Sequence, residues 1–484
     1  MNWIFIAEII YVFLVIAVCL RIIYDTNNTS KTLSYLLLTL FLPFAGMIIY
    51  FSVGTNYRKR KLYSKKLIKD DKLRKEITHR IHVQSEIVMG QKKPEVKKFK
   101  KLARLLLNGS LSQLTENNQV ELLLNGERKF PEVIKSLKAA KHHIHIEYYI
   151  FEDEVIGQQI KEVLIQKAIE GVQVRFIYDD FGSRSIRKKL VPEMEAAGVK
   201  CAPFYKIKFM KLANRVNYRN HRKIIIIDGH IAFTGGINVS DRYINSTEEP
   251  EKLYWRDTHV KIIGEGVYYL QYLFINDWNF CSEEELVPEK SFFDNAELIP
   301  SLGAVVQIAS SGPDSDNPTI LFSLLDAIGL AEEEILITTP YFIPGGSLLD
   351  EITVAALSGI QIKLLVPDKS DSFTVDAAAR SYYGELLKAG VEIYLYKKGF
   401  IHAKTLVSDT QLSIIGTANM DHRSFDLNFE VNTMIYDADF ARQLRDVFYE
   451  DLKNAVKINP DEWFERPLHK QFPEKVARLI SHLL

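Results

Sequence analysis

The chain has 484 residues, 47% of them hydrophobic, which is more than one compact core usually holds, so at least two folding units are expected. It carries 61 basic and 61 acidic residues, and this zero net charge argues against a chain that binds nucleic acid over its whole surface and against an acidic disordered protein. The three cysteines, Cys19, Cys201 and Cys281, lie far apart, which argues against a disulfide framework and a zinc ribbon.

Two apolar segments at the N-terminus are each long enough to cross a membrane as a helix, residues 3–20 and 33–53. A signal peptide is the alternative for the first, but no Lys or Arg precedes the apolar run and no small-residue cleavage site follows it. Residues 1–54 are therefore predicted to form a two-span membrane anchor. Pro43 and Gly46 should kink or loosen the second span.

A strongly basic stretch follows the second predicted span. Between residues 58 and 75 there are ten Lys or Arg residues and two Asp. Positive charge beside a span marks the cytoplasmic side, and two spans then return the N-terminus to that side as well. The stretch would also attract anionic lipid headgroups. The alternative is a solvated basic linker that has no role in lipid binding. Residues 55–116 are interpreted as a basic juxtamembrane linker of a multi-pass membrane protein, with the part of the chain that follows on the cytoplasmic side.

Beyond residue 116, short β-branched runs alternate with amphipathic helical stretches. Three segments are typical of buried strands and two of helices: 143–151, 172–178 and 223–227, and 155–170 and 190–197. This order predicts an α/β fold with mostly parallel strands. The same order recurs about 190 residues later, beginning with residues 334–343. The chain is thus divided into a first repeat, 117–300, and a second repeat, 301–484, which ends in a helix predicted to pack on the domain or to lie on the membrane.

One motif of the form HxKxxxxD occurs at the same place in both repeats. Its copies consist of His221, Lys223 and Asp228, and of His402, Lys404 and Asp409. A glycine and an asparagine follow each histidine by 14 and 17 residues: Gly235 and Asn238, and Gly416 and Asn419. A single copy would be weak evidence because these residue types are common. Two copies in matching register make coincidence improbable.

These residues are similar to the duplicated HKD motifs of the phospholipase D superfamily, and with its two predicted spans the whole chain resembles the bacterial cardiolipin synthases of that superfamily. The resemblance is carried by YRNHRKIIIIDG, FTGGINVSDRY, YWRDTHVKI, TTPYFIP, GFIHAKTLVSD and IIGTANMDHRSFDLNFEVN. It implies an α/β fold in which two phospholipase D-like repeats pack about a pseudo-twofold axis, preceded by two transmembrane helices.

The His and Lys of each motif are two residues apart, so in a strand they point to the same face. Packing of the two repeats would bring four side chains into one cleft: His221, Lys223, His402 and Lys404. The lysines would neutralise the non-bridging oxygens of a phosphodiester, and Asn238 and Asn419 would add neutral donors. One histidine would attack phosphorus to form a phosphohistidine while the other protonates the leaving oxygen. The N-terminal motif is the more usual source of the nucleophile in the superfamily, so the resemblance favours His221 as nucleophile and His402 as acid and base.

The resemblance also implies that an acidic residue downstream of each motif orients a histidine, Asp257 after the first motif and Glu430 after the second. All six motif residues are catalytic candidates, although within the motifs Asp228 and Asp409 are interpreted as structural supports at strand ends rather than as proton carriers. Other polar residues are expected to serve packing: His142, His143, His145, His230, His259, Glu147, Tyr149 and Tyr341. No HExxH, cysteine pair or P-loop is present, so neither a metal nor a nucleotide is expected as cofactor.

The resemblance implies a cardiolipin synthase. One phosphatidylglycerol would donate its phosphatidyl group to the enzyme, glycerol would leave, and a headgroup hydroxyl of a second phosphatidylglycerol would attack. The expected partners are therefore phosphatidylglycerol and anionic membrane lipids, not nucleic acid. The first alternative is a phospholipase D-type hydrolase or other transphosphatidylase. A superfamily nuclease is the second, and the spans and the zero net charge disfavour it. An inactive scaffold is the third, and the two intact motifs disfavour it.

Overall fold

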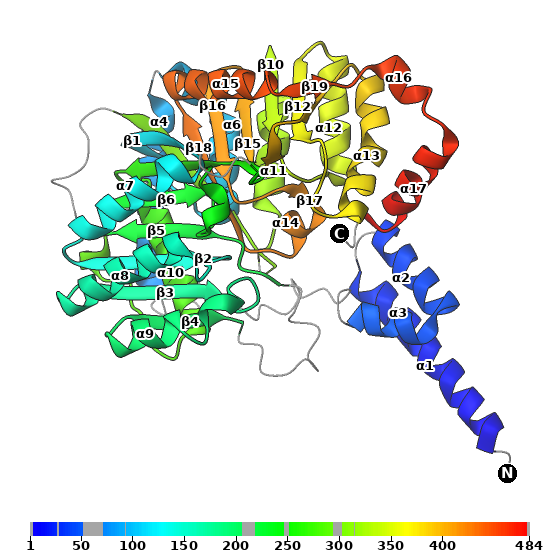
Figure 1. Ribbon diagram of the computed structural model, residues 1–484, viewed down its shortest axis with the longest axis horizontal. Helices are drawn as coiled ribbons and strands as arrows, with labels where there is room; N and C mark the ends of the chain where they lie inside the picture. Colours follow the sequence, from blue (N-terminus) through cyan, green and yellow to red (C-terminus); the bar gives the residue numbers. More distant parts are fainter. Residues whose placement is uncertain are drawn as a thin grey trace.

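The computed structural model describes residues 3–26, 29–51, 71–91, 93–205, 218–245, 251–293, 303–313 and 315–481, without the side chains of residues 30, 31 and 71–74. Most of the basic stretch, residues 52–53 of the second predicted span and residues 482–484 of the C-terminal helix lie outside the described residues. The described chain consists of a small N-terminal helical region and a large α/β unit (Figure 1).

The N-terminal region contains one helix of membrane-spanning length. Helix α1 (Trp3–Asp25) is long and apolar enough to cross a bilayer, and it is the one such helix among the described residues. The second predicted span is divided into α2 (Thr29–Phe41) and α3 (Pro43–Ile49), because Pro43 begins a new helix. A Cβ on Gly46 would lie 2.5 Å from the Cα of Thr39, so this close turn requires glycine. The kink predicted at Pro43 and Gly46 is confirmed.

Helix α3 leads the chain back toward the end of α1. The hydroxyl of Tyr50, just after α3, donates to Asp25 Oδ2 at 3.1 Å and lies 3.3 Å from the carbonyl oxygen of Arg21. The ring of Tyr50 also packs edge-on against that of Tyr35 in α2, with 5.7 Å between centroids. The chain therefore leaves α3 beside the point where α1 ends.

Both repeats contribute to one mixed sheet of fifteen strands. The first repeat supplies β1 (Thr115–Leu124), β2 (His143–Tyr148), β3 (Gln173–Asp179), β4 (Lys200–Phe204), β5 (Lys223–Ile227), β6 (Ile231–Gly235) and β8 (Thr258–Ile263). The second supplies β9 (Ala304–Ser311), β10 (Glu334–Thr338), β12 (Gln361–Pro367), β13 (Glu392–Tyr396), β15 (Thr405–Ser408), β16 (Leu412–Gly416), β18 (Glu430–Tyr436) and β19 (Ala455–Lys457). The strands predicted at 143–151, 172–178 and 223–227 are present as β2, β3 and β5, the first of them ending at Tyr148. The prediction of mostly parallel strands is wrong, because in this sheet parallel pairing joins only β2, β3 and β4 and, in the second repeat, β10, β12 and β13, while the other neighbouring strands pair antiparallel.

The strand order of the second repeat reverses that of the first. From one edge the sheet runs β4-β3-β2-β5-β6-β8-β1 and then β9-β18-β16-β15-β10-β12-β13, with β19 added at the far edge. The repeats meet where β1 pairs antiparallel with β9, at Thr115 opposite Val306 and Asn118 opposite Ala304. Two small sheets complete the strands, β7 (Tyr254–Arg256) with β14 (Gly399–Ile401), and β11 (Phe342–Ile343) with β17 (Met420–Asp421).

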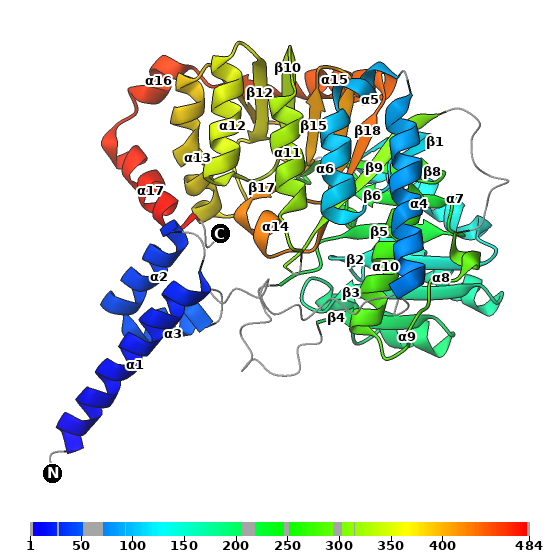
Figure 2. The same cartoon turned by 180° about the vertical axis from the view of Figure 1, so that it is seen from behind.

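Helices cover both faces of each half-sheet (Figures 1 and 2). In the first repeat α7 (Asn125–Ala139), α8 (Val155–Ile169) and α9 (Leu190–Ala196) pack on one face and α10 (Val267–Cys281) on the other. In the second, α11 (Thr319–Gly329), α12 (Gly345–Leu357) and α13 (Phe373–Lys388) correspond to the first set and α15 (Ala438–Leu452) to α10. Strand β5 shows the consequence, since Ile224 and Ile226 enter the core shared by both repeats while Ile225 and Ile227 enter the core under α7 and α8. Burial on both faces explains the uninterrupted apolar run of this strand.

Part of the segment predicted as a linker is folded onto the second repeat. It forms α4 (Asp71–Gly90), α5 (Pro94–Lys98) and α6 (Lys100–Ser110), which lie on the same side of the sheet as α11 (Figure 2). Leu102 and Leu106 of α6 are fully buried in the same core as Ile320 of α11. The side-chain amide of Gln307 in β9 donates to the carbonyls of Ala103 and Ser112 at 3.0 and 2.9 Å. These contacts attach α6 and the residues that follow it to the α/β unit.

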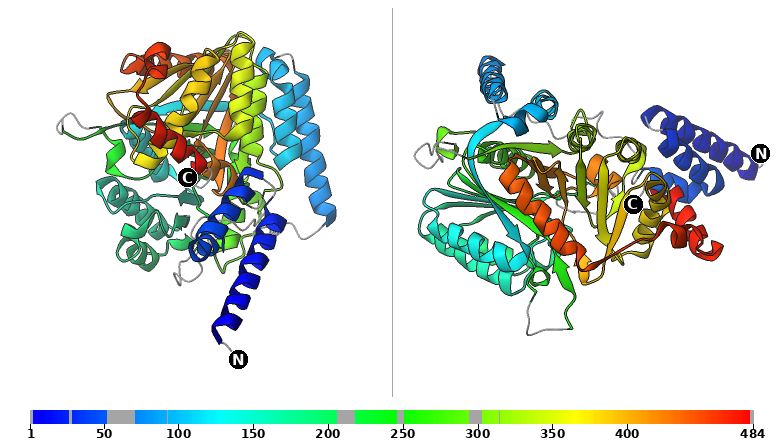
Figure 3. Two further views of the ribbon diagram at one scale, coloured as in Figure 1. Left: turned by 90° about the vertical axis from the view of Figure 1, so that its right-hand side faces the viewer. Right: turned by 90° about the horizontal axis from the view of Figure 1, so that it is seen from above.

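The C-terminal helices α16 (Pro460–Phe464) and α17 (Leu468–Leu479) pack on α13. The hydroxyls of Tyr382 and Ser481 lie 2.9 Å apart, and Ala477 joins the core beneath. The other side of α17 exposes Leu468, Phe472 and Leu479 by 79, 69 and 71%. In Figures 1 and 3 this helix lies beside α2.

Candidate active site

Each HKD motif is fastened by its backbone to a segment of the other repeat. The N–H of His221 donates to the carbonyl of Phe429 at 3.0 Å, and the N–H of Phe429 donates to the carbonyl of Arg219 at 2.9 Å. In the second motif the N–H of His402 donates to the carbonyl of Arg256 at 2.7 Å, where β14 pairs with β7. Since Glu430 and Asp257 directly follow these anchor residues, each motif is placed beside the acid of the opposite repeat.

The acid that orients each histidine therefore comes from the other repeat. His221 Nδ1 lies 2.9 Å from both carboxylate oxygens of Glu430. His402 Nδ1 lies 2.7 Å from Asp257 Oδ2. The expectation that each acid belongs to the motif preceding it in the chain is wrong, because pairing between repeats brings together residues 209 and 145 positions apart. An ionised carboxylate only accepts, so each Nδ1 carries the hydrogen and each Nε2 is left for substrate.

Each acid has further hydrogen bonds of its own. Glu430 accepts from Thr417 Oγ1 at 2.5 Å and from Asn428 Nδ2 at 3.2 Å, and Asp257 accepts from the N–H of Thr258 at 2.7 Å. Burial acts to raise the pKa of Glu430, but His221, Lys223 and Thr417 outweigh it and hold that pKa below its usual value. Sequence reasoning missed Thr417 and Asn428. The sequence contained a signal for Thr417, because it follows Gly416 at the position that matches Gly236 after Gly235 in the first repeat. In the structure Gly236 lies directly against the Asp257 carboxylate, so the matching positions both lie beside an orienting acid.

Each motif lysine bends back toward its own histidine. The prediction that His and Lys lie in one strand is wrong, because β5 begins at Lys223 and β15 begins at Thr405, so both histidines precede their strands. Lys223 Nζ donates to the carbonyl of His221 at 2.8 Å, and Lys404 Nζ to that of His402 at 2.5 Å. They are 0 and 4% exposed. Burial lowers the pKa of Lys223 to about 7 and that of Lys404 to about 8, although Glu430 and Asp257 act in the opposite direction on both. An arriving phosphodiester would supply the negative charge that these lysines lack.

The four motif side chains share one site. The charge of Lys404 acts on His221 and on Lys223, and the charge of Lys223 acts on His402. Burial, opposed by the neighbouring acid and reinforced by the lysines, lowers the pKa of His221 and takes that of His402 to about 4. Both histidines are at least 91% buried, at 9 and 8% exposure. The juxtaposition predicted for these four residues is present.

Aromatic rings enclose the two histidines. The ring of Tyr149 packs edge-on against His221, with 4.9 Å between centroids. Trp255, Tyr243 and Phe400 lie 5.6, 6.0 and 6.0 Å from His402. Tyr149 was expected to serve packing, and its packing partner is a catalytic candidate. The other three rings were not predicted, because they reach His402 from β7, β14 and the turn after β6.

The asparagines lie at the edge of this site. Asn238 accepts from the N–H of Ile150 at 3.3 Å and donates to the Tyr243 hydroxyl at 2.9 Å, and that hydroxyl lies 3.5 Å from His402 Nδ1. Asn419 Nδ2 donates to Asp421 Oδ2 at 3.1 Å. Each amide has two hydrogens, so each keeps one N–H for a ligand.

The motif aspartates lie away from the histidines, at the opposite ends of their strands. Asp228 accepts the backbone N–H groups of residues 141, 142 and 143 at 2.7–2.9 Å. Asp409 accepts those of residues 332, 333 and 334 at 2.7–2.8 Å and pairs with Lys98 Nζ at 2.6 Å. This geometry agrees with the structural role expected for them. It does not agree with their inclusion among the catalytic candidates, because neither reaches the reacting groups.

The remaining candidates serve structure in several ways. His143 and His145 are buried and share Gln271, whose side-chain atoms lie 3.0 and 2.7 Å from their ring nitrogens. His259 is fully buried, Glu147 accepts from Asn220, and Tyr341 donates to Asp371 at 2.8 Å. No group of three His, Cys, Asp or Glu side chains in the described part of the chain is arranged to hold a metal ion.

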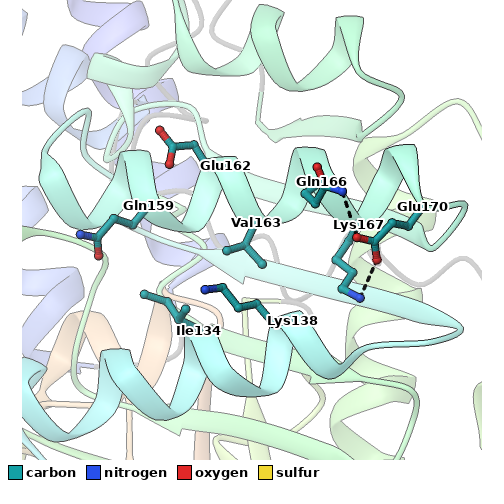
Figure 4. Close-up of a pocket in the computed structure, with 8 residues that line it drawn as sticks. All are labelled: Ile134, Lys138, Gln159, Glu162, Val163, Gln166, Lys167 and Glu170. Atoms are coloured by element: carbon teal, nitrogen blue, oxygen red, sulfur yellow. Dashed lines mark hydrogen bonds and ion pairs between the residues drawn. The ribbon is translucent and has the colours of Figure 1, made fainter.

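A groove of about 550 Å³ lies elsewhere, between α7 and α8 (Figure 4). Its walls carry Lys138, Glu162 and the ion pair of Lys167 with Glu170, at 2.8 Å. None of the motif residues lines it.

The chain is similar to known proteins over nearly its whole length. The family described as "Cardiolipin synthase, PLD-like domain" matches residues 133–261 and 324–452, and "Phospholipase_D-nuclease N-terminal" matches residues 10–54. Cardiolipin synthase 2 of Bacillus anthracis is 40% identical over 95% of this chain and 88% of its own length, and the major cardiolipin synthase ClsA of Bacillus subtilis is 39% identical over 95% of both chains.

A solved structure shares the fold. Phosphatidylserine synthase of Haemophilus influenzae superposes with a TM-score of 0.59 at 16% identity, over 80% of this chain and 100% of its own. With two matched domains and 40% identity over 95% of its length, the chain belongs to the bacterial cardiolipin synthase family of the phospholipase D superfamily.

Proposed function

We propose that this protein is a cardiolipin synthase, which transfers a phosphatidyl group from one phosphatidylglycerol to another and releases glycerol. One observation carries the reaction class. Two histidines lie in a single buried site, each with Nδ1 on a carboxylate of the other repeat, so both Nε2 atoms are left for a phosphorus centre and its leaving oxygen. Relatives named as cardiolipin synthases, 40% identical over 95% of the chain, support the choice of lipids.

In the first half-reaction, His221 Nε2 attacks the phosphorus of the donor phosphatidylglycerol. A P–N bond forms, and the bond between phosphorus and the glycerol oxygen breaks. The negative charge of the bound phosphodiester offsets the lysines that lower the pKa of His402 and so favours its protonated form. Protonated His402 gives its Nε2 proton to that oxygen, so that glycerol leaves as a neutral alcohol. Lys223 and Lys404 stabilise the charge that builds on the non-bridging oxygens, and Asn238 and Asn419 support them.

In the second half-reaction, the now neutral His402 removes the proton from a headgroup hydroxyl of the second phosphatidylglycerol. The hydroxyl oxygen attacks phosphorus, the P–N bond breaks, and His221 is regenerated as cardiolipin forms. Glu430 and Asp257 hold the two imidazoles in the required tautomer and stabilise the positive charge that each carries in turn.

Transfer rather than hydrolysis requires that water be kept from the phosphohistidine. The rings of Tyr149, Tyr243, Trp255 and Phe400 support this requirement, because they occupy the space around both histidines. A phospholipase D-type hydrolase is the competing function, since it would use the same histidines with water as acceptor.

The proposal includes a pseudo-twofold relation between the repeats and a catalytic unit at the cytoplasmic face of the membrane. The reversed strand order, and the pairing of each acid with the histidine of the other repeat, support the pseudo-twofold relation. Helix α1 and the exposed apolar side of α17 beside α2 support attachment to a bilayer. The excess of Lys and Arg after residue 57 supports the cytoplasmic side.

Two arrangements of the anchor are open to test. Two crossings place Asn28 outside and Ser85 inside, whereas a single crossing by α1, with α2 and α3 as a returning hairpin, places both inside and the N-terminus outside. The contact of Tyr50 with Asp25 favours the second arrangement. Single cysteines at residues 2, 28 and 85, labelled from outside intact cells, distinguish the two by whether residue 28 or residue 2 reacts.

The function itself is tested with purified protein in detergent micelles containing labelled phosphatidylglycerol. Cardiolipin and free glycerol in equal amounts support the proposal. Phosphatidic acid as the main product would show a hydrolase, and transfer only to an added alcohol would show another transphosphatidylase.

A further inference from the structure

Two arginines on the His221 side of the site have no part in the scheme above. Arg219 precedes His221 by two residues, and Arg184 begins the 3-10 turn η3 (Arg184–Ile186). Both guanidinium groups pack on the ring of Phe181, with their central carbons 4.3 and 4.0 Å from its centroid. Phe181 is 38% exposed, so this pair of cations is open to a ligand from outside.

The guanidinium of Arg219 is held firmly without a hydrogen-bond acceptor. The residue is 5% exposed, and its carbonyl is fixed by the N–H of Phe429. Within the described ranges, neither this guanidinium nor that of Arg184 forms a hydrogen bond or an ion pair with another residue. Arg184 is exposed, and Arg219 has no fully buried nitrogen without a partner, so both guanidinium groups can reach a ligand. An anion that accepts from them would form charge-assisted hydrogen bonds, which are stronger than neutral ones.

The nearest negative charge is already engaged. Asp179 acts electrostatically on Arg219, but its carboxylate accepts the backbone N–H groups of Phe181, Gly182 and Asn220 at 3.0, 2.8 and 3.3 Å. Arg423 and Arg184 act on Arg219 with the opposite sign. Arg219 and Arg184 together carry two positive charges against the one negative charge of Asp179, so this pair keeps an excess of positive charge.

The cluster is connected to the reacting centre through Tyr149. This ring packs on His221, and the charges of Arg219 and Arg423 both act on its hydroxyl. Arg219 and His221 lie two residues apart on the segment that pairs with Phe429, which separates their Cα atoms by about 7 Å if it is extended. A three-carbon glycerol bridge between two phosphates spans a comparable distance.

The reaction requires a second anion site at about this separation. The donor phosphate occupies the centre between Lys223 and Lys404, so the phosphodiester of the accepting lipid must be held elsewhere while its hydroxyl reaches the phosphohistidine. At the matching position of the second repeat, two residues before His402, the chain has Phe400, packed on Trp255 at 4.9 Å. The cationic site is thus on one side of the centre only.

We propose that Arg219 and Arg184 bind the phosphodiester of the accepting phosphatidylglycerol and so select a phosphorylated alcohol over water or free glycerol. This inference rests on the proposed function. It assigns to the two arginines a role in the second half-reaction and none in formation of the phosphohistidine.

The test compares two reactions of the same purified enzyme in micelles. Cardiolipin formation needs an acceptor with a phosphate, whereas exchange of labelled free glycerol into phosphatidylglycerol uses the same intermediate and an acceptor without one. Arg219→Gln and Arg184→Gln are each expected to lower cardiolipin formation at least about tenfold, as loss of a charge-assisted contact does, with glycerol exchange kept within about twofold. Arg219→Lys should recover part of the loss. The matched control is Arg187→Gln, which removes a charge from the same loop, where Arg187 pairs with Asp180 at 3.0 Å.

Equal loss of both reactions in Arg219→Gln with normal thermal unfolding would overturn the inference, because the arginine would then serve the donor phosphate or the chemistry. Unchanged cardiolipin formation in both variants would overturn it as well. If Arg219→Gln does not fold, Arg184→Gln, on an exposed turn, decides. Failure of the proposed function would look different, since the wild-type enzyme itself would then form no cardiolipin.

Discussion

The surroundings of the two histidines are alike in what holds them and unlike in what lies beside them. Both imidazoles donate from Nδ1 to a buried carboxylate of the other repeat, and both motif lysines bond the carbonyl of their own histidine. Beyond this, His221 has Tyr149 and the arginine cluster as neighbours, whereas His402 is enclosed by Trp255, Tyr243 and Phe400.

This difference indicates which parts of a duplicated site must stay equal. A phosphoryl group in transfer carries charge on all its non-bridging oxygens and meets a nucleophile on one side and a leaving oxygen on the other, so both halves must present a cation and an oriented base. The two lipids that use the centre arrive differently. The parts of the wall that meet only one of them are free to diverge.

The largest expected effect is loss of either histidine. His221→Ala and His402→Ala should each abolish cardiolipin formation while the protein still folds and inserts. The roles are separated by acid-quenched trapping of labelled intermediate and peptide mapping. Label on the peptide containing His221, persisting in His402→Ala, supports the assignment, and label on the peptide containing His402 would reverse the two roles.

Removal of either motif lysine should have the next largest effect. Lys223→Ala and Lys404→Ala are each expected to lower kcat by about 10²- to 10³-fold, as loss of a preorganised donor to a developing oxyanion does. Initial rates with saturating phosphatidylglycerol measure this. A loss confined to KM would show that the lysines bind the ground state and the transition state equally.

The crossed pairing of acids and histidines predicts which half-reaction each acid affects. Glu430→Gln should slow formation of the trapped phosphohistidine about 10²-fold, because it leaves His221 without its orienting carboxylate. Asp257→Asn should slow proton transfer by His402 by a similar factor and should be partly rescued by a donor lipid whose leaving alcohol is more acidic. If the donor with the more acidic leaving alcohol rescued Glu430→Gln and not Asp257→Asn, the pairing of Glu430 with His221 and of Asp257 with His402 would be contradicted.

The pH dependence should follow the motif lysines on its alkaline side. With pKa values of about 7 for Lys223 and about 8 for Lys404, the unliganded site loses positive charge as the pH rises through this range, so kcat/KM should fall there. On the acid side, protonation of His221 removes the nucleophile, and burial places that step below the ordinary imidazole value. Lys223→Arg keeps its charge, so any activity it retains should fall off at higher pH than in the wild type.

The smallest expected effect on chemistry concerns the motif aspartates. Asp228→Ala and Asp409→Ala each remove a carboxylate that accepts three backbone N–H groups, which should lower the free energy of unfolding by about 2 to 4 kcal/mol. Asp409→Ala should lose more because it also releases Lys98 of α5. Because its hydrogen bonds to Lys98 and to backbone N–H groups outweigh burial and lower the pKa of Asp409, this stability is present near neutral pH and is lost as the pH falls through the folded-state pKa. Thermal unfolding of both variants at pH 7 measures the loss, and a series from pH 7 to pH 2 on the wild type and Asp409→Ala measures its pH dependence.

Much of this site could be predicted from short-range pattern. The alternation of strands and helices, the repeat of about 190 residues and the HxKxxxxD spacing depend on neighbours in the chain. The same short spacing keeps the His and Lys of each motif together, although each histidine lies just before its strand. The kink at Pro43 follows from the missing N–H of a single residue. That α1 is one apolar helix follows from composition alone.

Only the tertiary structure decided which residues meet across the repeats. Pairing of Phe429 with the segment before His221, and of Arg256 with the segment before His402, places each acid on the histidine of the other repeat, and no spacing within one repeat contains that information. Other contacts likewise depend on elements far apart in sequence. They include the packing of Arg219 on Phe181 and of Phe400 on Trp255, the contact of α6 with β9, and the turn of α3 back to Asp25. The sequence by itself thus determined the reacting groups and their superfamily, because these depend on local spacing, whereas the surroundings that separate the two histidines arise only when distant strands pair.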